Sequence, residues 1–186
     1  MIKYGPIRAA DISRIMELYA EHLNSGGDIE EIIGTSWKNG SYIGCTAKEN
    51  GEIIGFLTVR MGIAFTYPHP ELEAELAAFV QEKRVAMCDS LLVLPPYRNR
   101  GIAHRLAEQT RKLLLDMSFD YFLTEIWVYP DGNIPARGTF ETMGTVLWQR
   151  QIDHFYEDLE RYGMCCPVCG THCVCGALVE ILEIKE

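Results

Sequence analysis

Apolar residues in the N-terminal part of the chain follow the spacing of an amphipathic helix. Within residues 11–23 they recur at intervals of three and four, so one helical face carries Ile12, Ile15, Met16, Tyr19 and Leu23. Asp11 stands where an N-cap is expected. The same spacing predicts a helix over residues 101–117, and a shorter helical patch is predicted over residues 28–38.

Runs of β-branched, aromatic and other apolar residues predict strands between these helices. The expected strands cover residues 1–9, 42–48, 53–60, 86–94, 120–129, 145–155 and 177–185. Asn50-Gly51 joins the second and third strands and is a strong signal for a hairpin turn. A further helix is predicted at residues 133–143, with Gly144 as its C′ residue.

This order of elements predicts a mixed α/β sheet protein. Residues 61–84 interrupt the order, because Tyr67-Pro68-His69-Pro70 breaks any regular element and a stretch rich in helix formers follows it. We therefore interpret residues 61–84 as a helical insertion within a single domain spanning residues 1–186.

The composition of this chain of 186 residues excludes several classes of protein. A formal net charge of −9 is unusual for a nucleic-acid-binding protein, which normally carries a basic surface. The sequence contains no run of about 18 apolar residues, so no membrane-spanning helix is expected. Its first residues do not show the pattern of a signal peptide. These observations predict a cytoplasmic protein that binds neither nucleic acid nor a membrane.

The most informative segment is the turn after the strand at residues 86–94. Pro95-Pro96 stops the strand, and Arg98, Arg100 and Gly101 precede a helix. The first N–H groups of a helix have no partner within it and lie at the positive end of its dipole. Glycine lets an anion approach this backbone closely, and arginine forms charge-assisted hydrogen bonds with phosphate. The turn therefore predicts a phosphate site, although a solvated surface turn has the same composition.

Two motifs carry a resemblance to a known family. Residues 98–103, Arg-Asn-Arg-Gly-Ile-Ala, resemble the motif Arg/Gln-x-x-Gly-x-Gly/Ala, with which the GNAT superfamily of acetyltransferases binds the pyrophosphate of acyl-CoA. The spacing of a later helix in that family is matched by Asn133, Ala136, Phe140 and Gly144. The resemblance follows the element order over residues 1–160 and reaches motif level in residues 86–145.

The resemblance implies an α/β fold with a mixed, mostly antiparallel sheet of about seven strands, flanked by helices. It also implies that the strands at residues 86–94 and 121–129 splay apart to admit acetyl-CoA, the expected co-substrate. The implied cofactor contacts are the backbone of the first strand, the amides of the turn, and a group on the other side of the cofactor. These residues are Leu92, Val93 and Leu94; Arg98, Asn99, Arg100, Gly101, Ile102 and Ala103; and Asn133, Arg137 and Phe140.

Acetyl transfer to an amine needs a base for the ammonium proton, a donor for the tetrahedral oxyanion and an acid for the thiolate. The resemblance places Asp89 where several family members carry a glutamate proposed as base, and Glu125 on the facing strand is a second candidate. The backbone N–H near Val93 or Leu94 is the candidate oxyanion donor. Tyr156 resembles the tyrosine that serves as general acid in N-terminal-amine acetyltransferases. A structural carboxylate and a packing aromatic are the alternative interpretations of Asp89 and Tyr156.

Five of the seven cysteines lie between positions 165 and 175, in a loop at residues 163–176 that is not part of the family pattern. The loop contains a Cys-Pro-x-Cys-Gly knuckle, which resembles half of a zinc ribbon or rubredoxin-like site. The predicted ligands are Cys166, Cys169, Cys173 and Cys175, with His172 as an alternative to one of them. Zinc is the first expectation and iron–sulfur the second, while free or redox-active thiols and local disulfides stay open.

The leading prediction is an acetyl-CoA-dependent N-acetyltransferase that moves an acetyl group to a primary amine by direct attack. The alternatives are a non-catalytic acyl-CoA-binding or regulatory module, and a protein-interaction domain built on the cysteine loop. The acidic balance favours a cationic small-molecule or peptide amine as acceptor. A homodimer is also open.

Overall fold

The computed structural model describes residues 1–23, 29–61, 70–80, 84–158 and 165–185. Its strands form one seven-stranded sheet in the order β1-β2-β3-β4-β5-β7-β6. The strand bounds are β1 Ile2–Pro6, β2 Tyr42–Glu49, β3 Glu52–Met61, β4 Val85–Val93, β5 Tyr121–Val128, β6 Thr145–Ile152 and β7 Gly176–Glu183. Neighbouring strands run antiparallel, except that β4 and β5 run parallel. The predicted mixed and mostly antiparallel sheet is therefore confirmed.

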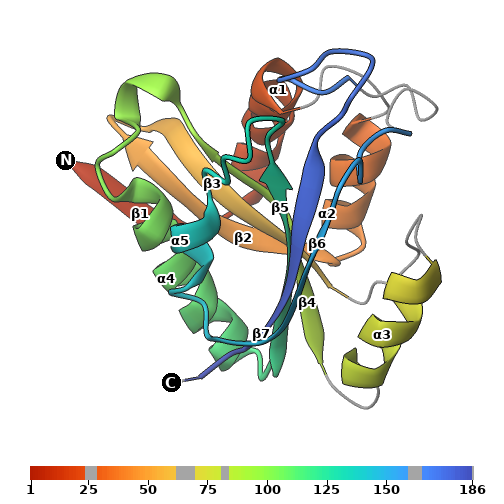
Figure 1. The fold of residues 1–186 in the computed structure, drawn as a ribbon. Helices are drawn as coiled ribbons and strands as arrows, with labels where there is room; N and C mark the ends of the chain where they lie inside the picture. Colours follow the sequence, from red (N-terminus) through yellow and green to blue (C-terminus); the bar gives the residue numbers. More distant parts are fainter. Residues whose placement is uncertain (24–28, 62–69, 81–83, 159–164, 186) are drawn as a thin grey trace.

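Helices cover both faces of this sheet (Figure 1). On one face lie α4 Ile102–Asp116 and α5 Arg137–Phe140, and on the other lie α1 Ile12–His22 and α3 Pro70–Val80. We call these the α4–α5 face and the α1–α3 face. Shorter helical turns complete the described elements: η1 Ala9–Asp11, η2 Glu30–Thr35, α2 Ser36–Lys38 and η3 Pro95–Tyr97.

The segment expected to be an insertion contributes α3 to the α1–α3 face. Leu72 and Leu76 are fully buried there, against Leu123 of β5 and Val179 of β7. Residues 62–69 and 81–83 lie outside the described residues. They include most of the Tyr67-Pro68-His69-Pro70 segment, which was expected to break regular structure, and the end of the expected helix. A helix of about three turns is thus confirmed at this position, and it closes one end of the core.

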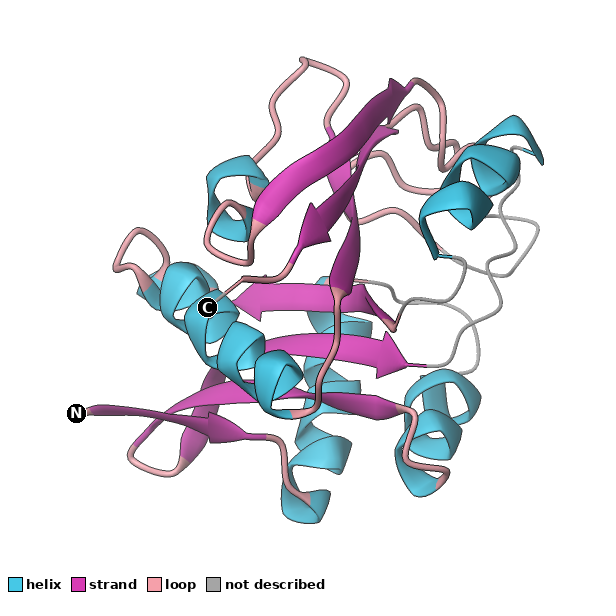
Figure 2. Ribbon diagram, turned by 90° about the horizontal axis from the view of Figure 1, so that it is seen from below, coloured by secondary structure: helices cyan, strands magenta, loops and turns pink. Residues whose placement is uncertain are grey.

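The sheet divides between β4 and β5. These strands pair only at Val85↔Tyr121, Ala86↔Phe122 and Met87↔Leu123, and beyond Met87 they diverge. Figure 2 shows the consequence: β1 to β4 lie roughly along one axis, whereas β5, β7 and β6 lie steeply across that axis. The predicted splay is confirmed, and it leaves one backbone edge of each strand without a strand partner.

Two local signals in the sequence had different outcomes. Asn50 and Gly51 form the β2–β3 turn with φ of 52° and 93°, as an Asn-Gly hairpin requires. Asp11 does not cap α1 through its side chain. Its carboxylate instead accepts the backbone N–H of Arg8 at 3.1 Å and forms an ion pair with Lys48 at 2.5 Å, so it ties the start of the helix to β2.

The helix expected at residues 133–143 is reduced to the short α5. Gly138, Thr139 and Thr142 have low helix propensity, and the chain continues from α5 as turns. Gly144 does not adopt the positive φ expected of a C′ residue. Glycine is needed there for another reason, because a Cβ at this position would overlap the carbonyl oxygen of Glu183 on β7.

We predict that Gly144→Ala lowers the free energy of unfolding by about 1–3 kcal/mol, because the methyl group forces the β6–β7 end apart. Gly138→Ala is the matched control, since a Cβ there meets no atom within 4 Å. Urea denaturation followed by circular dichroism measures both. Equal stability of the two variants would contradict the close contact at Gly144.

Candidate active site

The backbone of β4 beyond Met87 faces the gap between the two halves of the sheet. Leu94 donates its N–H to the carbonyl of Ile54 at 2.9 Å, so Leu94 is bonded to β3. Backbone direction alternates along a strand, so Leu92 also faces β3, whereas Leu91 and Val93 face the gap. Leu94 is therefore a wrong choice as oxyanion donor, and the N–H of Val93 is the candidate that the geometry supports.

Leu91 is a gap-facing residue that sequence reasoning missed. Its backbone occupies the gap-facing position two residues before Val93, whereas the family resemblance implies a cofactor contact at Leu92. The side chain of Leu92 is buried in the α1 core cluster. The period of two along β4 could have identified Leu91, but only once the register with β3 was known.

The turn after β4 presents a set of backbone N–H groups. Gly101 has φ of 72° and Asn99 has φ of 59°, so two residues of this turn are left-handed. The N–H groups of Ile102, Ala103 and His104 lie in the first turn of α4 and have no acceptor within the helix. A Cβ at Gly101 would meet no atom within 4 Å, so the space in front of this turn is open. Such an arrangement binds anions.

Two arginines flank the turn and are exposed. Arg98 donates its Nε hydrogen to the carbonyl of Val93 at 3.0 Å, which ties the turn to the gap-facing position of β4. The guanidinium of Arg100 lies 5.3 Å from the ring centroid of Tyr97, a cation–π contact that leaves its N–H groups available. Both groups add positive charge at the end of β4 in an otherwise acidic chain.

The three residues predicted on the other side of the cofactor do not share one environment. Asn133 is exposed, and its carbonyl accepts the N–H of Tyr129 at 2.9 Å. Phe140 is only 3% exposed and packs against Phe122, so its ring is part of the hydrophobic core. Arg137 is exposed near Glu180. Burial raises the pKa of the Glu180 carboxyl, and the Arg137 guanidinium opposes this shift.

Asp89 lies in a β-bulge of β4. Ser90 pairs with Thr58 and Cys88 with Val59, so Asp89 is the extra residue. The bulge turns Asp89 toward the α1–α3 face, while Cys88 packs against the α4–α5 core. Burial raises the pKa of the Cys88 thiol, and the Asp89 carboxylate adds to that effect.

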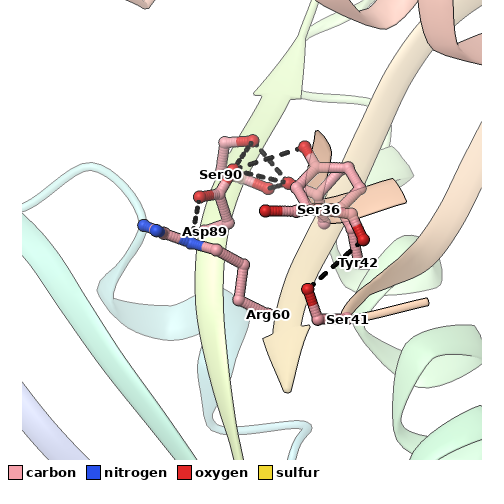
Figure 3. Close-up of polar contacts among 7 residues, drawn as sticks. Ser36, Ser41, Tyr42, Arg60, Asp89 and Ser90 are labelled. Carbon is pink, nitrogen blue, oxygen red and sulfur yellow. Dashed lines mark hydrogen bonds and ion pairs between the residues drawn. The ribbon is translucent and has the colours of Figure 1, made fainter. Parts of the chain in front are cut away.

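The Asp89 carboxylate is enclosed by polar partners (Figure 3). Arg60 Nε forms an ion pair with Oδ1 at 2.7 Å. The hydroxyls of Tyr42 and Thr58 donate to Oδ2 at 3.3 Å, and that of Ser90 lies at 3.4 Å. The Asp89 side chain is 1% exposed and that of Arg60 is 37% exposed, so solvent reaches the arginine and not the carboxylate.

The neighbouring tyrosines also respond to this carboxylate. Burial raises the pKa of Tyr19 to about 12, and the negative charge of Asp89 contributes to the rise. The same two causes raise the pKa of Tyr42 well above its usual value. Both phenols therefore stay protonated at neutral pH, and Tyr42 donates its hydroxyl hydrogen to Asp89.

Glu125 lies across the gap from Asp89. Met87 pairs with Leu123, and Asp89 and Glu125 each lie two residues further along these parallel strands, where the strands no longer pair. Side chains alternate along β5, so Glu125 shares the α1–α3 face with Leu123 and Trp127. Glu125 and Asp89 are both half-buried as whole residues, although the carboxylate-bearing side chain of Asp89 is only 1% exposed. The structure thus brings the two carboxylates to the same face, one on each side of the gap.

Tyr156 follows β6 and packs at the same end of β5. Its ring centroid lies 5.3 Å from that of Trp127 and 5.0 Å from that of Phe155. Its backbone N–H donates to the carbonyl of Cys175 at 3.4 Å. Tyr156 and Glu125 therefore border the same region, and Trp127 joins them as a residue that sequence reasoning did not single out.

The predicted metal ligands gather in one place. The sulfur atoms of Cys166, Cys169, Cys173 and Cys175 all lie within 4.8 Å of one another. The Sγ atom of Cys175 is 3.4 Å from that of Cys169 and 3.9 Å from that of Cys166. The seven cysteines, all of them within the described residues, form no disulfide.

The loop holds these sulfurs by ordinary backbone bonds. Cys166 and Gly170 exchange N–H and carbonyl bonds at 3.0 and 2.9 Å, with Gly170 at φ of 79°. The N–H groups of Val168 and Cys169 point at the sulfur of Cys166, each at 3.4 Å. Such N–H···S bonds stabilise a thiolate, so the knuckle is arranged for a charged sulfur ligand.

The fold and the site together define the class of protein. The model of the acetyltransferase (GNAT) family matches residues 12–145, which is more than half of the chain. The protein therefore belongs to this family, and the sequence-based resemblance is confirmed. No curated protein matches the sequence.

Solved structures agree with this assignment. NAA60 of Arabidopsis thaliana in complex with acetyl-CoA gives a TM-score of 0.69 at 17% identity, covering 100% of both chains. The ribosomal-protein-S18-alanine N-acetyltransferase from Escherichia coli gives 0.63 at 14% identity, covering 100% of this chain and 96% of that one. The Drosophila melanogaster polyamine N-acetyltransferase gives 0.65 at 13% identity, covering 99% and 100%. At these identities the likeness concerns the fold.

A membrane-spanning role finds no support in the helices. Within the described part of the chain, no helix combines the length and the apolar character needed to cross a bilayer.

Proposed function

We propose that this protein transfers the acetyl group of acetyl-CoA to a primary amine by direct attack. The observation that carries the proposal is the opening between β4 and β5, which ends at the open amide turn around Gly101. An extended, polar cofactor with a phosphate at one end fits this combination of a free strand edge and an anion site. The family membership of the chain supports the same chemistry.

The backbone groups of β4 have defined roles in this proposal. The pantetheine arm binds the gap-facing groups of Leu91 and Val93, and the pyrophosphate binds the amides of the turn with Arg98 and Arg100. The amine nitrogen attacks the thioester carbon, and the N–H of Val93 stabilises the oxyanion that forms. When the C–S bond breaks, the CoA thiolate takes a proton, for which Tyr156 is the proposed donor.

Of the two carboxylates, we assign the base to Glu125. Both oxygens of Asp89 are already occupied by Arg60 and three hydroxyls, and its side chain is 1% exposed. A proton could reach Asp89 only through a bridging water or one of these partners. Glu125 is half-buried on the opposite side of the gap. In this proposal Asp89 fixes the geometry of β4 at the bulge.

The acceptor is proposed to be a cationic amine on a peptide or a small molecule. A net charge of −9 concentrates cations near the protein surface. Structural neighbours include a ribosomal-protein-S18-alanine acetyltransferase and a polyamine acetyltransferase, so the fold serves both kinds of acceptor. A cytoplasmic location and a homodimer stay predictions from the sequence.

We also propose that the four clustered cysteines bind one zinc ion. In a tetrahedral site with Zn–S bonds of about 2.3 Å, sulfur atoms are about 3.8 Å apart. Two of the separations are 3.4 and 3.9 Å, and all four sulfurs lie within 4.8 Å of one another. Four thiolates form a closed structural site, in which zinc contributes to folding of the loop and not to the chemistry of transfer.

The first prediction from the proposed function concerns the cofactor site. Gly101→Ala is expected to weaken CoA binding by roughly tenfold or more, because a Cβ enters the open space where hydrogen bonds to phosphate form. Gly51→Ala is the control, since its φ of 93° imposes a similar backbone strain in the β2–β3 hairpin. Calorimetric titration with CoA measures both. No binding of CoA to the unaltered protein would refute the proposed cofactor.

The second prediction separates the two carboxylates. Glu125→Gln is expected to lower kcat by about 10²- to 10⁴-fold, as for the loss of a general base. Asp89→Asn is expected to lower the free energy of unfolding by roughly 2 kcal/mol and to keep most of the activity, because it breaks the contact with Arg60. Thiol release over a panel of amines and urea denaturation measure the two effects.

Two outcomes would change this assignment. If Asp89→Asn abolished turnover while stability held, Asp89 would be the base, as the sequence predicts. If the unaltered protein bound CoA but acetylated no amine of any class, the non-catalytic acyl-CoA-binding alternative would replace the enzyme.

The third prediction concerns the metal. The purified protein is expected to contain one zinc ion per chain, and Cys169→Ser is expected to remove most of it. Cys165→Ser is the matched control, because Cys165 is a neighbour of the cluster but is not one of the four grouped sulfurs. Elemental analysis of protein purified without added metal measures the content. Iron and inorganic sulfide in place of zinc would support the iron–sulfur alternative.

A further inference from the structure

The four-cysteine cluster is packed directly against the aromatic side chains at the end of the gap. Cys166, Cys173 and Cys175 are each at most 3% exposed, and they form a small core with Trp127 and Tyr156. Trp127 belongs to β5, whereas Tyr156 belongs to the turn after β6. The cluster therefore joins two segments that the sheet alone does not hold together.

Tyr156 contacts this cluster, and it also packs against the core cluster beside α3. Tyr156 lies beyond the end of β6 at Ile152, so no strand pairing holds it. Its N–H donates to the carbonyl of Cys175, a predicted ligand, at 3.4 Å. Its ring rests on Trp127, whose indole is covered by the same cysteines. Contacts to the loop thus reach both the backbone and the ring of Tyr156.

The cluster is in turn anchored to the sheet. Cys175 is followed at once by Gly176, the first residue of β7, which pairs with Val128 of β5. A Cβ at Gly176 would press on the carbonyl of Ile152 in β6, so this glycine is held closely between the two neighbouring strands. One ligand therefore has a fixed position, and a metal ion bound to it would fix the other three relative to β5.

We propose that the metal-loaded cysteine loop is a clasp that holds Trp127 and Tyr156 at the acceptor side of the gap. Metal occupancy then sets the rate of acetyl transfer and not the affinity for CoA. The inference rests on the proposed acetyltransferase function. Tyr156 acts on the substrate in this proposal, and the four cysteines are positioning residues that act through it.

Metal loss is expected to change the rate of acetyl transfer without changing the affinity for CoA, because the cysteine cluster and the proposed cofactor site lie on different halves of the sheet. The proposed cofactor site consists of the gap-facing backbone of β4, η3 and the first turn of α4. The hydrophobic contacts of the cluster are with Trp127 and Tyr156, on the other half of the divided sheet. Loss of metal therefore disturbs the acceptor half and leaves the phosphate half in place.

A spectroscopic experiment tests the clasp without relying on activity. In a Trp37→Phe, Trp148→Phe background, Trp127 is the remaining tryptophan of the three in the chain. Loading this protein with Co²⁺ is expected to produce the visible absorption of a tetrahedral thiolate site and to quench most of the Trp127 emission by energy transfer. Cobalt binding that leaves the emission unchanged would overturn the proposal, because the metal would then lie away from Trp127.

A kinetic experiment tests whether metal occupancy sets the rate of acetyl transfer. Removal of metal with a chelator, or Cys173→Ser, is expected to lower kcat roughly 10- to 100-fold, as for a displaced catalytic group. The dissociation constant of CoA should not change, and re-addition of Zn²⁺ should restore the chelated protein. Cys165→Ser is the control expected to keep kcat.

The outcomes distinguish the clasp from the proposed function. An unchanged kcat after complete metal loss would refute the clasp while leaving an acetyltransferase. Loss of CoA binding and of circular dichroism on metal removal would also refute it, since the metal would then support the whole fold. If no amine were acetylated by the unaltered protein, the acetyltransferase proposal would fail together with the claim on rate, whereas the quenching result would still decide whether the loop holds Trp127.

Discussion

The short pairing between β4 and β5 is the constraint on which the rest of the structure depends. Three residue pairs join these strands before they diverge, so the sheet is continuous at one end and open at the other. Each half is stabilised by its own apolar core on the α1–α3 face, while α4 and α5 cover both halves from behind. The opening is therefore stable without strand partners, and its free backbone groups are available to a ligand.

Groups of opposite character are arranged along this opening. At the end of β4, an open turn with left-handed residues presents amides and arginines to an anion. Nearer the middle, a bulge turns Asp89 inward, where Arg60 neutralises it. Glu125 stands across the gap on β5, two residues beyond the last strand pair, as Asp89 does on β4. This order, from phosphate site to carboxylates, matches the direction in which an acyl-CoA would lie.

The cysteine loop adds a local centre to a family fold. Small loops contain too few apolar residues to fix their own structure, and the tetrathiolate metal site that we propose for this loop would compensate for this. Here the sulfurs also cover Trp127 and approach Tyr156, so the order of the loop and the order of the acceptor side are physically connected. A loop that differs from the family pattern can thus influence the site through packing alone.

The sequence by itself determined whatever depends on local spacing. It predicted every strand, the turn at Gly101 and the four grouped cysteines, because periodicity, glycine position and ligand spacing are properties of short segments. Tertiary structure decided the rest. The strand register places the backbone groups of Leu91 and Val93, and not those of Leu92 and Leu94, on the gap side of β4. Arg60 pairs with the buried carboxylate of Asp89. The carbonyl of Glu183 explains why residue 144 is glycine. These outcomes depend on groups far away in the chain, whose approach is fixed only when the sheet forms.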